Sequence, residues 1–344
     1  MEFLAHVPVS GEVVAFASLA LGLTAVAAQR SVTKHNPIHI PNVAEFERKR
    51  AAIIAGGAEQ LTVVADFDRT LTPNRLPSGE RGMSCHGIVE SCQSLSESYR
   101  RETAALFRRF FPIEVSPHIP RSEKIPLMRR WYAENHRLLE KEHLTRADLV
   151  RAVAESNISL RPGARSLIAS CATAGIPLLV FSAGIKDIIE EVLAQHYGAL
   201  PDGLHVVSNK MAWSPAGRHT GFHPPLIHMF NKDESHLRGV GWFEDAGARR
   251  NALVLGDSLG DAVMAGDDGE RHDVVLRVGF LNEVETEGEL LAAYSRAFDV
   301  VVLRDSSLDF VMSHILGDVF ASAKLAKAAA AGAAGSAAAA SPAP

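Results

Sequence analysis

The sequence predicts an α/β fold built on a doubly wound parallel sheet, and three short apolar runs are the main observation. Residues 61–65, 176–181 and 252–255 are almost wholly apolar and rich in branched side chains. Such runs are typical of strands that are buried on both faces of a parallel sheet. Each run is followed by a polar cluster, DFDRT, SAG and GDSLGD in that order. Because doubly wound sheets bind ligands at the carboxyl ends of their strands, we expect the three clusters to meet in one crevice.

Three further runs complete the predicted sheet. Residues 204–207, 274–278 and 300–303 are also short and apolar, and helical stretches separate the runs along the chain. An alternation of strands and helices is typical of α/β proteins, in which helices cover the faces of a mostly parallel sheet. We therefore predict that residues 41–80 and 163–320 form an α/β core.

A long helical interval follows DFDRT. Between residues 73 and 162 the chain has no convincing buried strand, but residues 88–110 and 122–142 carry apolar side chains at helical spacing beside many charges. This pattern is typical of a small helical domain. We predict a helical cap domain over residues 81–162, inserted after the first strand, where it can close over the crevice and carry substrate-selecting residues.

The two ends of the chain differ from this pattern. Residues 13–28 (VVAFASLALGLTAVAA) are uncharged, yet they lack a basic start and are shorter than the ~20 apolar residues that span a bilayer. The leader, residues 1–40, is therefore either an amphiphilic or buried helix, or a targeting or anchoring segment. Residues 321–344 form an alanine-rich, low-complexity tail that is too poor in large apolar groups to pack a core.

Charge and cysteine content limit the partners and the compartment. The formal net charge is −5 and the pI is about 6.3, so no broad basic field favours nucleic acid. The chain has three cysteines, Cys85, Cys92 and Cys171. This small, odd number fits a reducing compartment better than a disulfide framework. We expect a cytoplasmic monomer; the alternative is an organelle-targeted or membrane-anchored protein held through residues 13–28.

DFDRT places two carboxylates, Asp66 and Asp68, directly after a buried strand. In such a pair, one ionised carboxylate on magnesium can attack phosphorus while the other transfers a proton. An isolated D-x-D is more often a solvated loop at the end of a strand. The following Thr70, which completes D-x-D-x-T, makes the catalytic interpretation firmer.

The remaining clusters supply groups that bind phosphate and metal. The hydroxyl of Ser182 in FSAG and the neighbouring backbone N–H groups can hold a phosphate oxygen, although a serine before Ala-Gly is more often a helix cap. Asp257 and Asp261 in GDSLGD offer the hard oxygen ligands that Mg²⁺ requires, although this loop also suits an ordinary turn. The joint occurrence of these clusters, in this order, favours a magnesium-dependent phosphoryl-transfer site.

At the level of families, the chain resembles the haloacid-dehalogenase superfamily and, more closely, the cytosolic 5′-nucleotidase III family, also called pyrimidine 5′-nucleotidases. Some members of that family hydrolyse 7-methylguanosine monophosphate. The resemblance runs from about residue 53 to residue 316 and rests on VVADFDRTLT, SCHGIVESC, IEVSP, EKIPLMRRWY, VFSAGIKDIIEEV, VVSN, LIHMFNKDE and LVLGDSLGD. It implies a haloacid-dehalogenase-like catalytic core with a helical cap, and it covers neither the leader nor the tail.

The resemblance also implies roles for individual residues. Asp66 would be the nucleophile and a metal ligand, and Asp68 would be the general acid and then the base, with its backbone carbonyl on the metal. Asp257 would complete the magnesium shell. Thr70 and Asp261 would support the site. Ser182, Ala183 and Lys232 would bind the phosphate.

In the cap, Glu114 of IEVSP matches the family's base-recognising glutamate. Asn135 stands where the family has a serine near the nucleoside, a departure that bears on base preference. Trp131 and Tyr132 offer faces for stacking a base, with core packing as the alternative. Cys85, His86 and Cys92 have no second Cys/His pair nearby, so we do not expect zinc.

The sequence therefore predicts a magnesium-dependent 5′-nucleotidase, a phosphoric monoester hydrolase. It would release phosphate from UMP, CMP or 7-methylguanosine monophosphate through an aspartyl-phosphate. Two alternatives remain: a phosphatase of another small monophosphate such as phosphoserine, and a catalytically idle nucleotide-binding protein.

Overall fold

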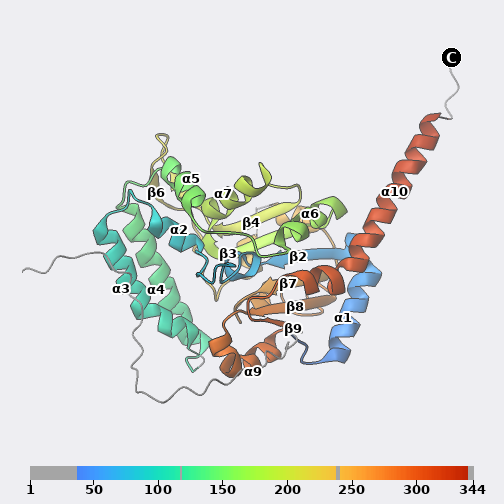
Figure 1. Cartoon of the computed structure of the whole chain (residues 1–344), viewed down its shortest axis with the longest axis horizontal. Coiled ribbons are helices and arrows are strands. Elements are labelled where there is room, and N and C mark those ends of the chain that lie inside the picture. Colours follow the sequence, from blue (N-terminus) through green and yellow to red (C-terminus); the bar gives the residue numbers. More distant parts are fainter. Residues whose placement is uncertain (1–36, 117, 238–240, 340–344) are drawn as a thin grey trace, which may run out of the picture. The chain divides into compact units, whose positions relative to one another are not determined.

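The computed structural model describes residues 37–116, 118–237 and 241–339, and its centre is a seven-stranded sheet (Figure 1). The strands lie in the order β1-β9-β8-β7-β2-β3-β4. All neighbours are parallel except β1, which pairs antiparallel with β9. The bounds are β1 Ile38–His39, β2 Leu61–Ala65, β3 Leu178–Ile185, β4 Leu204–Asn209, β7 Asn251–Gly256, β8 Val274–Leu281 and β9 Val300–Leu303. The predicted α/β fold and its six apolar strands are confirmed.

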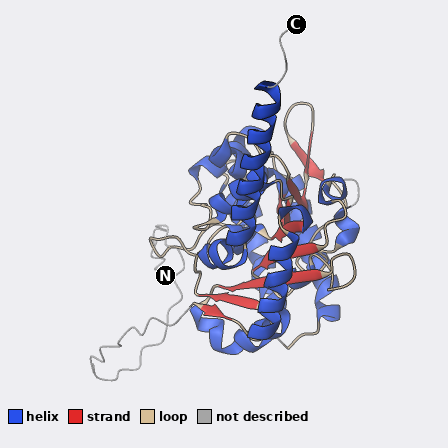
Figure 2. Cartoon of the chain, turned by 90° about the vertical axis from the view of Figure 1, so that its right-hand side faces the viewer, coloured by secondary structure: helices blue, strands red, loops and turns tan. Residues whose placement is uncertain are grey.

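The strands are apolar throughout because side chains of both faces are buried. Val63 and Ala65 of β2 belong to one hydrophobic cluster, whereas Val64 belongs to a second cluster on the opposite face. Helices lie on both sides of the sheet (Figure 2). The helices of the core are α1 Val43–Gly56, α6 Ala164–Ala174, α7 Lys186–Tyr197, α8 Trp242–Ala246, α9 Glu287–Ala297 and α10 Gly317–Ala339.

Register brings three polar clusters to one edge of the sheet. β2 lies between β7 and β3, and Ala65 pairs with Leu255 of β7 and with Val180 of β3. The residues that follow these three strands therefore emerge side by side, as the sequence predicts.

A helical insert separates β2 from β3. It contains α2 Cys85–Ser91, α3 Glu97–Val115, α4 Arg121–Glu140 and α5 Arg146–Glu155. The structure divides the predicted helical segment 88–110 between α2 and α3, because Ser96 caps a new helix by accepting a hydrogen bond from the Tyr99 backbone N–H. A small hairpin, β5 Met211–Trp213 and β6 His219–Phe222, packs against α4, where Phe222 stacks on His136 with ring centroids 3.7 Å apart.

The ends of the chain differ in what the structure describes. The alanine-rich tail continues as helix α10 to Ala339, and Leu325 on this helix is 72% exposed. The apolar segment predicted as a leader, residues 13–28, lies outside the described residues. Within the described part of the chain, the helices are too short or too polar to cross a bilayer.

Candidate active site

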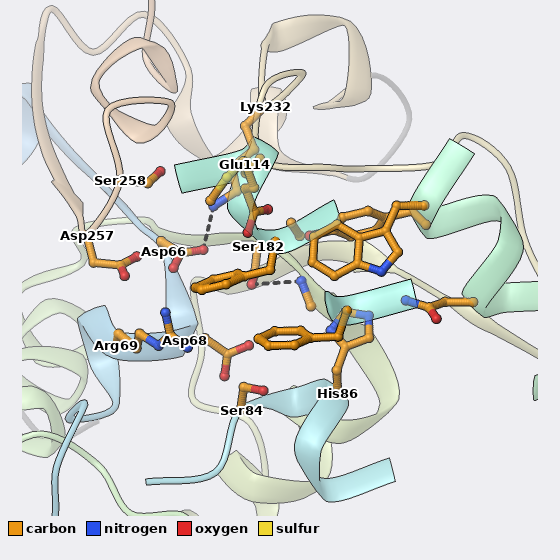
Figure 3. A pocket seen from close by; sticks show the side chains of 18 of the residues that line it. Asp66, Asp68, Arg69, Ser84, His86, Glu114, Ser182, Lys232, Asp257 and Ser258 are labelled. Carbon is orange, nitrogen blue, oxygen red and sulfur yellow. Dashed lines mark hydrogen bonds and ion pairs between the residues drawn. The ribbon is translucent and has the colours of Figure 1, made fainter. Parts of the chain in front are cut away.

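A cavity of about 190 Å³ lies at the carboxyl ends of β2, β3 and β7 (Figure 3). This volume is more than ten times the roughly 10–15 Å³ that a cavity needs in order to hold one water molecule, so the cavity can take a small organic ligand. Residues of the insert form the far wall. The lining includes Asp66, Asp68, Arg69, His86, Glu114, Trp131, Tyr132, Asn135, Ser182, Ala183, Lys232, Asp257 and Asp261.

Asp66 follows β2 directly and is 4% exposed. Its backbone N–H donates to the carbonyl oxygen of Leu255, which fixes it against β7. The Lys232 ammonium lies 2.5 Å from Asp66 Oδ1 and 2.7 Å from Asp261 Oδ1. Burial raises the pKa of Asp66 to about 7, against the opposing effect of Lys232. The lysine therefore joins two buried carboxylates that would otherwise repel each other.

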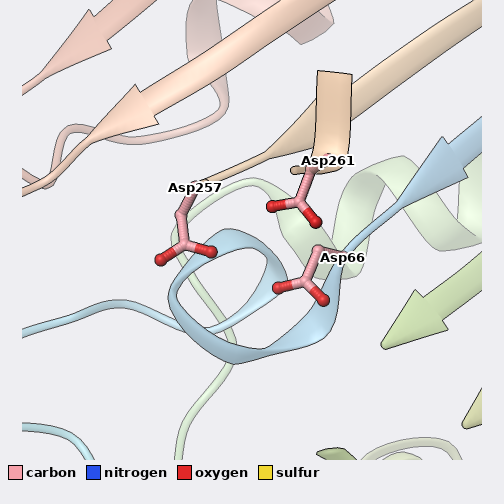
Figure 4. Close-up of side chains that lie close together, drawn as sticks. All are labelled: Asp66, Asp257 and Asp261. Atoms are coloured by element: carbon pink, nitrogen blue, oxygen red, sulfur yellow. The ribbon is translucent and has the colours of Figure 1, made fainter. Parts of the chain in front are cut away.

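Three carboxylates form a cluster that can hold a metal ion. Asp66, Asp257 and Asp261 each place an oxygen so that these atoms all lie within 4.8 Å of one another (Figure 4). Burial, Asp66 and Asp261 raise the pKa of Asp257 well above its usual range. A divalent cation would relieve this repulsion, and a set of carboxylate oxygens suits a hard cation.

Asp261 is the most restrained of the three. It is fully buried, its Oδ1 accepts from Lys232, and its Oδ2 accepts from the backbone N–H and the hydroxyl of Ser258 at 2.9 and 2.8 Å. Gly256 lies so close that a Cβ there would stand 2.2 Å from the Asp261 Cβ. This packing explains why a glycine precedes Asp257.

The carboxylate of Asp68 lies apart from the acidic cluster, at the N-terminus of α2. Both of its oxygens accept from the Cys85 backbone N–H, at 3.0 and 3.2 Å. Burial raises the pKa of Asp68, against the effects of His86 and the Cys85 amide. A carboxyl group with a raised pKa is suited to donate a proton near neutral pH.

The turn after Asp66 is held in an unusual conformation. Arg69 has φ 63°, its N–H donates to Thr72 Oγ1, and its carbonyl oxygen accepts from Arg161 and from Asn282. Thr70 is fully buried outside the cavity lining, and its carbonyl oxygen accepts from Arg161 Nε at 2.7 Å. The local strain of a non-glycine residue at positive φ is thus offset by bonds from the surrounding core.

Ser182 lies in a different local structure from the predicted turn. β3 continues through Ser182 to Ile185, but its pairing with β4 is interrupted between Phe181 and Ile185. Ser182 Oγ accepts from the Gly184 backbone N–H at 3.1 Å. A Cβ at Gly184 would lie 2.9 Å from Cys85 Sγ, so this segment packs tightly against α2.

The insert contributes a wall of mixed character. Glu114 lies near the end of α3, and burial raises its pKa to about 7. Trp131 is 7% exposed and stacks on Phe110 with centroids 5.9 Å apart, so it serves both core packing and the cavity wall. Tyr132 and Asn135 follow on α4 and also line the cavity.

Several lining residues were not predicted as site residues. Arg69 and Ser258 stand inside motifs that the sequence singled out, so motif position was the available signal. Phe107 and Phe111 on α3 stack with centroids 4.6 Å apart, and no sequence pattern distinguishes them from core residues. The three cysteines are buried and unpaired.

The fold and these side chains define the class of protein. A parallel sheet that presents an Asp-x-Asp pair, a serine, a lysine and a second acidic cluster at adjoining strand ends is that of a haloacid-dehalogenase-type hydrolase. The family model described as pyrimidine 5′-nucleotidase (UMPH-1) matches residues 69–319. The chain belongs to this family and is a 5′-nucleotidase, a phosphoric monoester hydrolase, as the motifs predict.

Similar proteins agree with this assignment. The 7-methylguanosine phosphate-specific 5′-nucleotidase of Homo sapiens is 37% identical over 270 residues, which are 77% of this chain and 88% of that protein. The corresponding protein of Drosophila melanogaster is 34% identical over 77% of this chain and 82% of its own length. A crystal structure of cytosolic 5′-nucleotidase IIIB bound to cytidine superposes with a TM-score of 0.77, with 31% identity and coverage of 85% of this chain and 96% of that chain.

Proposed function

We propose that the chain hydrolyses nucleoside 5′-monophosphates, namely UMP, CMP or 7-methylguanosine monophosphate, to nucleoside and phosphate. The observation that carries this proposal is the composition of one cavity: Asp66, Asp68 and Lys232 on its sheet side, and Trp131, Tyr132 and Glu114 on its insert side. Phosphoryl transfer needs the first group, and an aromatic wall with a carboxylate suits a base that carries N–H donors. An amino-acid phosphate such as phosphoserine has no group that would use the aromatic wall.

In the proposed mechanism, Asp66 attacks the 5′-phosphorus and the bond to the 5′-oxygen breaks. Asp68 donates its proton to that leaving oxygen, and the product is an aspartyl-phosphate. Asp68 then accepts a proton from water as the water attacks phosphorus, which releases phosphate and restores Asp66. Lys232, the Ser182 hydroxyl and the Ala183 N–H bind the phosphoryl oxygens.

We assign the metal as magnesium, which Asp66, Asp257 and the backbone carbonyl of Asp68 would hold. When bound, Mg²⁺ would offset negative charge on the phosphate and on the carboxylates. Asp261, whose oxygens already accept from Lys232 and Ser258, supports the site by holding the lysine. Thr70 would support the turn through its carbonyl oxygen, which accepts a hydrogen bond from Arg161 Nε.

Residues 81–162 would act as the cap, with Glu114 and Asn135 facing the nucleoside. Asn135 Oδ1 is buried and accepts no hydrogen bond from the described residues, so it is available to a ligand. We propose a cytoplasmic, monomeric enzyme; a relative from Caenorhabditis elegans, 34% identical, is described as a putative cytosolic 5′-nucleotidase 3.

The test is phosphate release from UMP, CMP, 7-methylguanosine monophosphate, AMP and phosphoserine, with Mg²⁺ and with chelator. We expect metal-dependent hydrolysis of at least one pyrimidine or methylguanosine nucleotide, and its loss in Asp66→Asn. Hydrolysis of phosphoserine alone would refute the nucleotide assignment. Nucleotide binding without turnover would favour the idle binding protein.

A further inference from the structure

Asn209, the last residue of β4, forms hydrogen bonds with two segments of the chain that lead to proposed phosphate-binding residues. It is 1% exposed, and it does not line the cavity. Its Nδ2 lies within hydrogen-bond distance of three carbonyl oxygens, those of Ala183 at 2.9 Å, Gly184 at 3.1 Å and Ile227 at 2.8 Å, so its two hydrogens are shared among them. Its Oδ1 accepts from the Ile227 N–H at 2.9 Å. One side chain therefore satisfies polar groups of two separate segments.

The first segment is the interrupted end of β3. Between Phe181 and Ile185, where β3 loses its regular pairing with β4, the carbonyls of Ala183 and Gly184 need other donors. Asn209 supplies them. The bonds fix the backbone next to Ser182 and Ala183, both of which line the cavity.

The second segment leads to Lys232. Residues 226–231 precede the lysine and form no strand or helix. Asn209 holds Ile227 on one side, and Asn231 holds the same loop internally: its Nδ2 donates to the Leu226 carbonyl at 2.9 Å and its Oδ1 accepts from the His228 N–H at 2.7 Å. Lys232 then reaches Asp66 and Asp261.

We propose that Asn209 is a positioning residue that fixes the distance between the two halves of the phosphate site, the Ser182–Ala183 segment and Lys232. The proposal rests on the function proposed above. Phosphoryl transfer depends on positioning and electrostatics, and an error of about 1 Å in the placement of a group can cost about 100-fold in rate. Asn209 acts without contacting the substrate.

The test compares three alanine variants with wild type. Asn209→Ala should lower kcat/KM by about 100-fold and raise the inhibition constant of inorganic phosphate by about tenfold. Asn231→Ala removes hydrogen bonds only within the loop of residues 226–231 that precedes Lys232. It should therefore have a smaller effect in the same direction. Asn251→Ala is the matched control, because Asn251 is also a buried asparagine but lies at the opposite end of β7 and donates to the Ala52 carbonyl. It should lower Tm and leave phosphate inhibition unchanged.

A double-mutant cycle with Lys232→Ala separates positioning from general stability. If Asn209 acts through the lysine, Asn209→Ala should cost clearly less in the Lys232→Ala background than in wild type. Equal costs in both backgrounds, or an unchanged phosphate inhibition constant, would overturn the proposal.

A second variant keeps the test available if Asn209→Ala does not fold. Asn209→Asp retains the acceptor for Ile227 and loses the amide donors. Protonation of the new carboxyl returns one donor, so its kcat/KM relative to wild type should rise as pH falls; a flat ratio would contradict the positioning role. Absence of activity in wild type would instead refute the proposed function.

Discussion

At the scale of single residues, Arg69 is distinguished by what it does not contact. Among the described residues that line the cavity, one lysine, Lys232, and one arginine, Arg69, carry a positive charge. Lys232 already bonds to Asp66 and Asp261. The Arg69 guanidinium makes no hydrogen bond or ion pair with the described part of the chain. It lies next to Asp68 (Figure 3), and its charge opposes the rise that burial causes in the pKa of Glu114 and of Asp257. A free guanidinium among carboxylates is available to an anionic ligand.

Replacement of Arg69 should therefore weaken phosphate binding. A hydrogen bond to a charged group contributes about 1.5–3 kcal/mol, so Arg69→Met should raise KM for the nucleotide by roughly tenfold to 100-fold. Inhibition by phosphate should weaken equally, and inhibition by the nucleoside should not. The control is Arg75→Met, an exposed arginine near Glu283. Unchanged inhibition by phosphate in Arg69→Met would exclude the contact.

Glu114 predicts a dependence of substrate binding on pH. Burial raises its pKa to about 7, so the side chain is neutral below that pH and becomes a carboxylate acceptor above it. Base N–H donors bind more strongly to the ionised form. KM should therefore fall between about pH 6 and pH 8, by up to about tenfold, and Glu114→Gln should remove this dependence. Parallel profiles for wild type and variant would show that another group titrates.

At the scale of elements, the end of β3 packs tightly against α2. This contact places the segment with Ser182 and Ala183, the proposed phosphate-binding residues, beside Asp68. A Cβ at Gly184 would lie 2.9 Å from Cys85 Sγ, 3.1 Å from Cys85 Cβ and 3.3 Å from Asp68 Oδ2. Any side chain there must push β3 and α2 apart. The position needs glycine for space, since no positive φ is involved.

Gly184→Ala should destabilise the protein by about 1–3 kcal/mol. It should also lower kcat while changing KM less, because Asp68 is hydrogen-bonded to Cys85, the first residue of α2, and would move with that helix. Thermal unfolding and steady-state kinetics measure the two effects. Gly288→Ala is the control, because Gly288 lies in α9 with no atom within 4 Å of its added Cβ. The control should be neutral or slightly stabilising. Wild-type kinetics in Gly184→Ala would show that α2 can move without consequence.

Each parallel strand of the sheet could be predicted from its own local pattern. Features that depend on contacts between distant parts of the chain could not. Val63, Val64 and Ala65 are apolar because both faces of β2 are covered, and this leaves a clear local pattern. The continuation of β3 through Ser182 depends on Asn209 from another strand, so no local pattern marks it. The hairpin β5–β6 is likewise stabilised by contacts distant in sequence, such as that of Phe222 with His136. Asp66 and Asp257 directly follow the buried strands β2 and β7, and Asp68 stands two residues after Asp66, so local patterns place these carboxylates at the same edge of the sheet.

At the scale of the whole molecule, Arg161 connects segments that are far apart in the chain. It is 1% exposed, donates to the carbonyls of Arg69, Thr70 and Ser306, and forms an ion pair with Asp305 at 3.0 Å. Asp305 in turn accepts from the backbone N–H groups of Asn74 and Arg75. This network joins the start and the end of the helical insert to the end of β9.

Arg161→Leu should destabilise the protein by about 3–5 kcal/mol, because it removes the charge partner of Asp305 and leaves the carbonyl oxygens of Thr70 and Ser306 without their donor. The free energy of unfolding by denaturant measures this. Arg48→Leu is the comparison, because it removes an exposed arginine paired with Glu45 on α1 and should change stability little. Similar losses in both variants would show that burial of the Arg161 network contributes nothing.

The central claim is that Asp66 carries the phosphoryl group during turnover. Asp68 acts in both steps, as the acid of the first and the base of the second, so its replacement slows formation of the intermediate as well as its hydrolysis, and the wild-type enzyme is the one in which to trap it. The most direct measurement is rapid acid quench of the wild-type enzyme during turnover with substrate and Mg²⁺, followed by peptide mass spectrometry. We predict a phosphoryl group on the peptide that contains Asp66, at the Asp66 side chain, and none in Asp66→Asn. Nucleoside release without a phosphorylated peptide, or phosphate on another residue, would contradict the account.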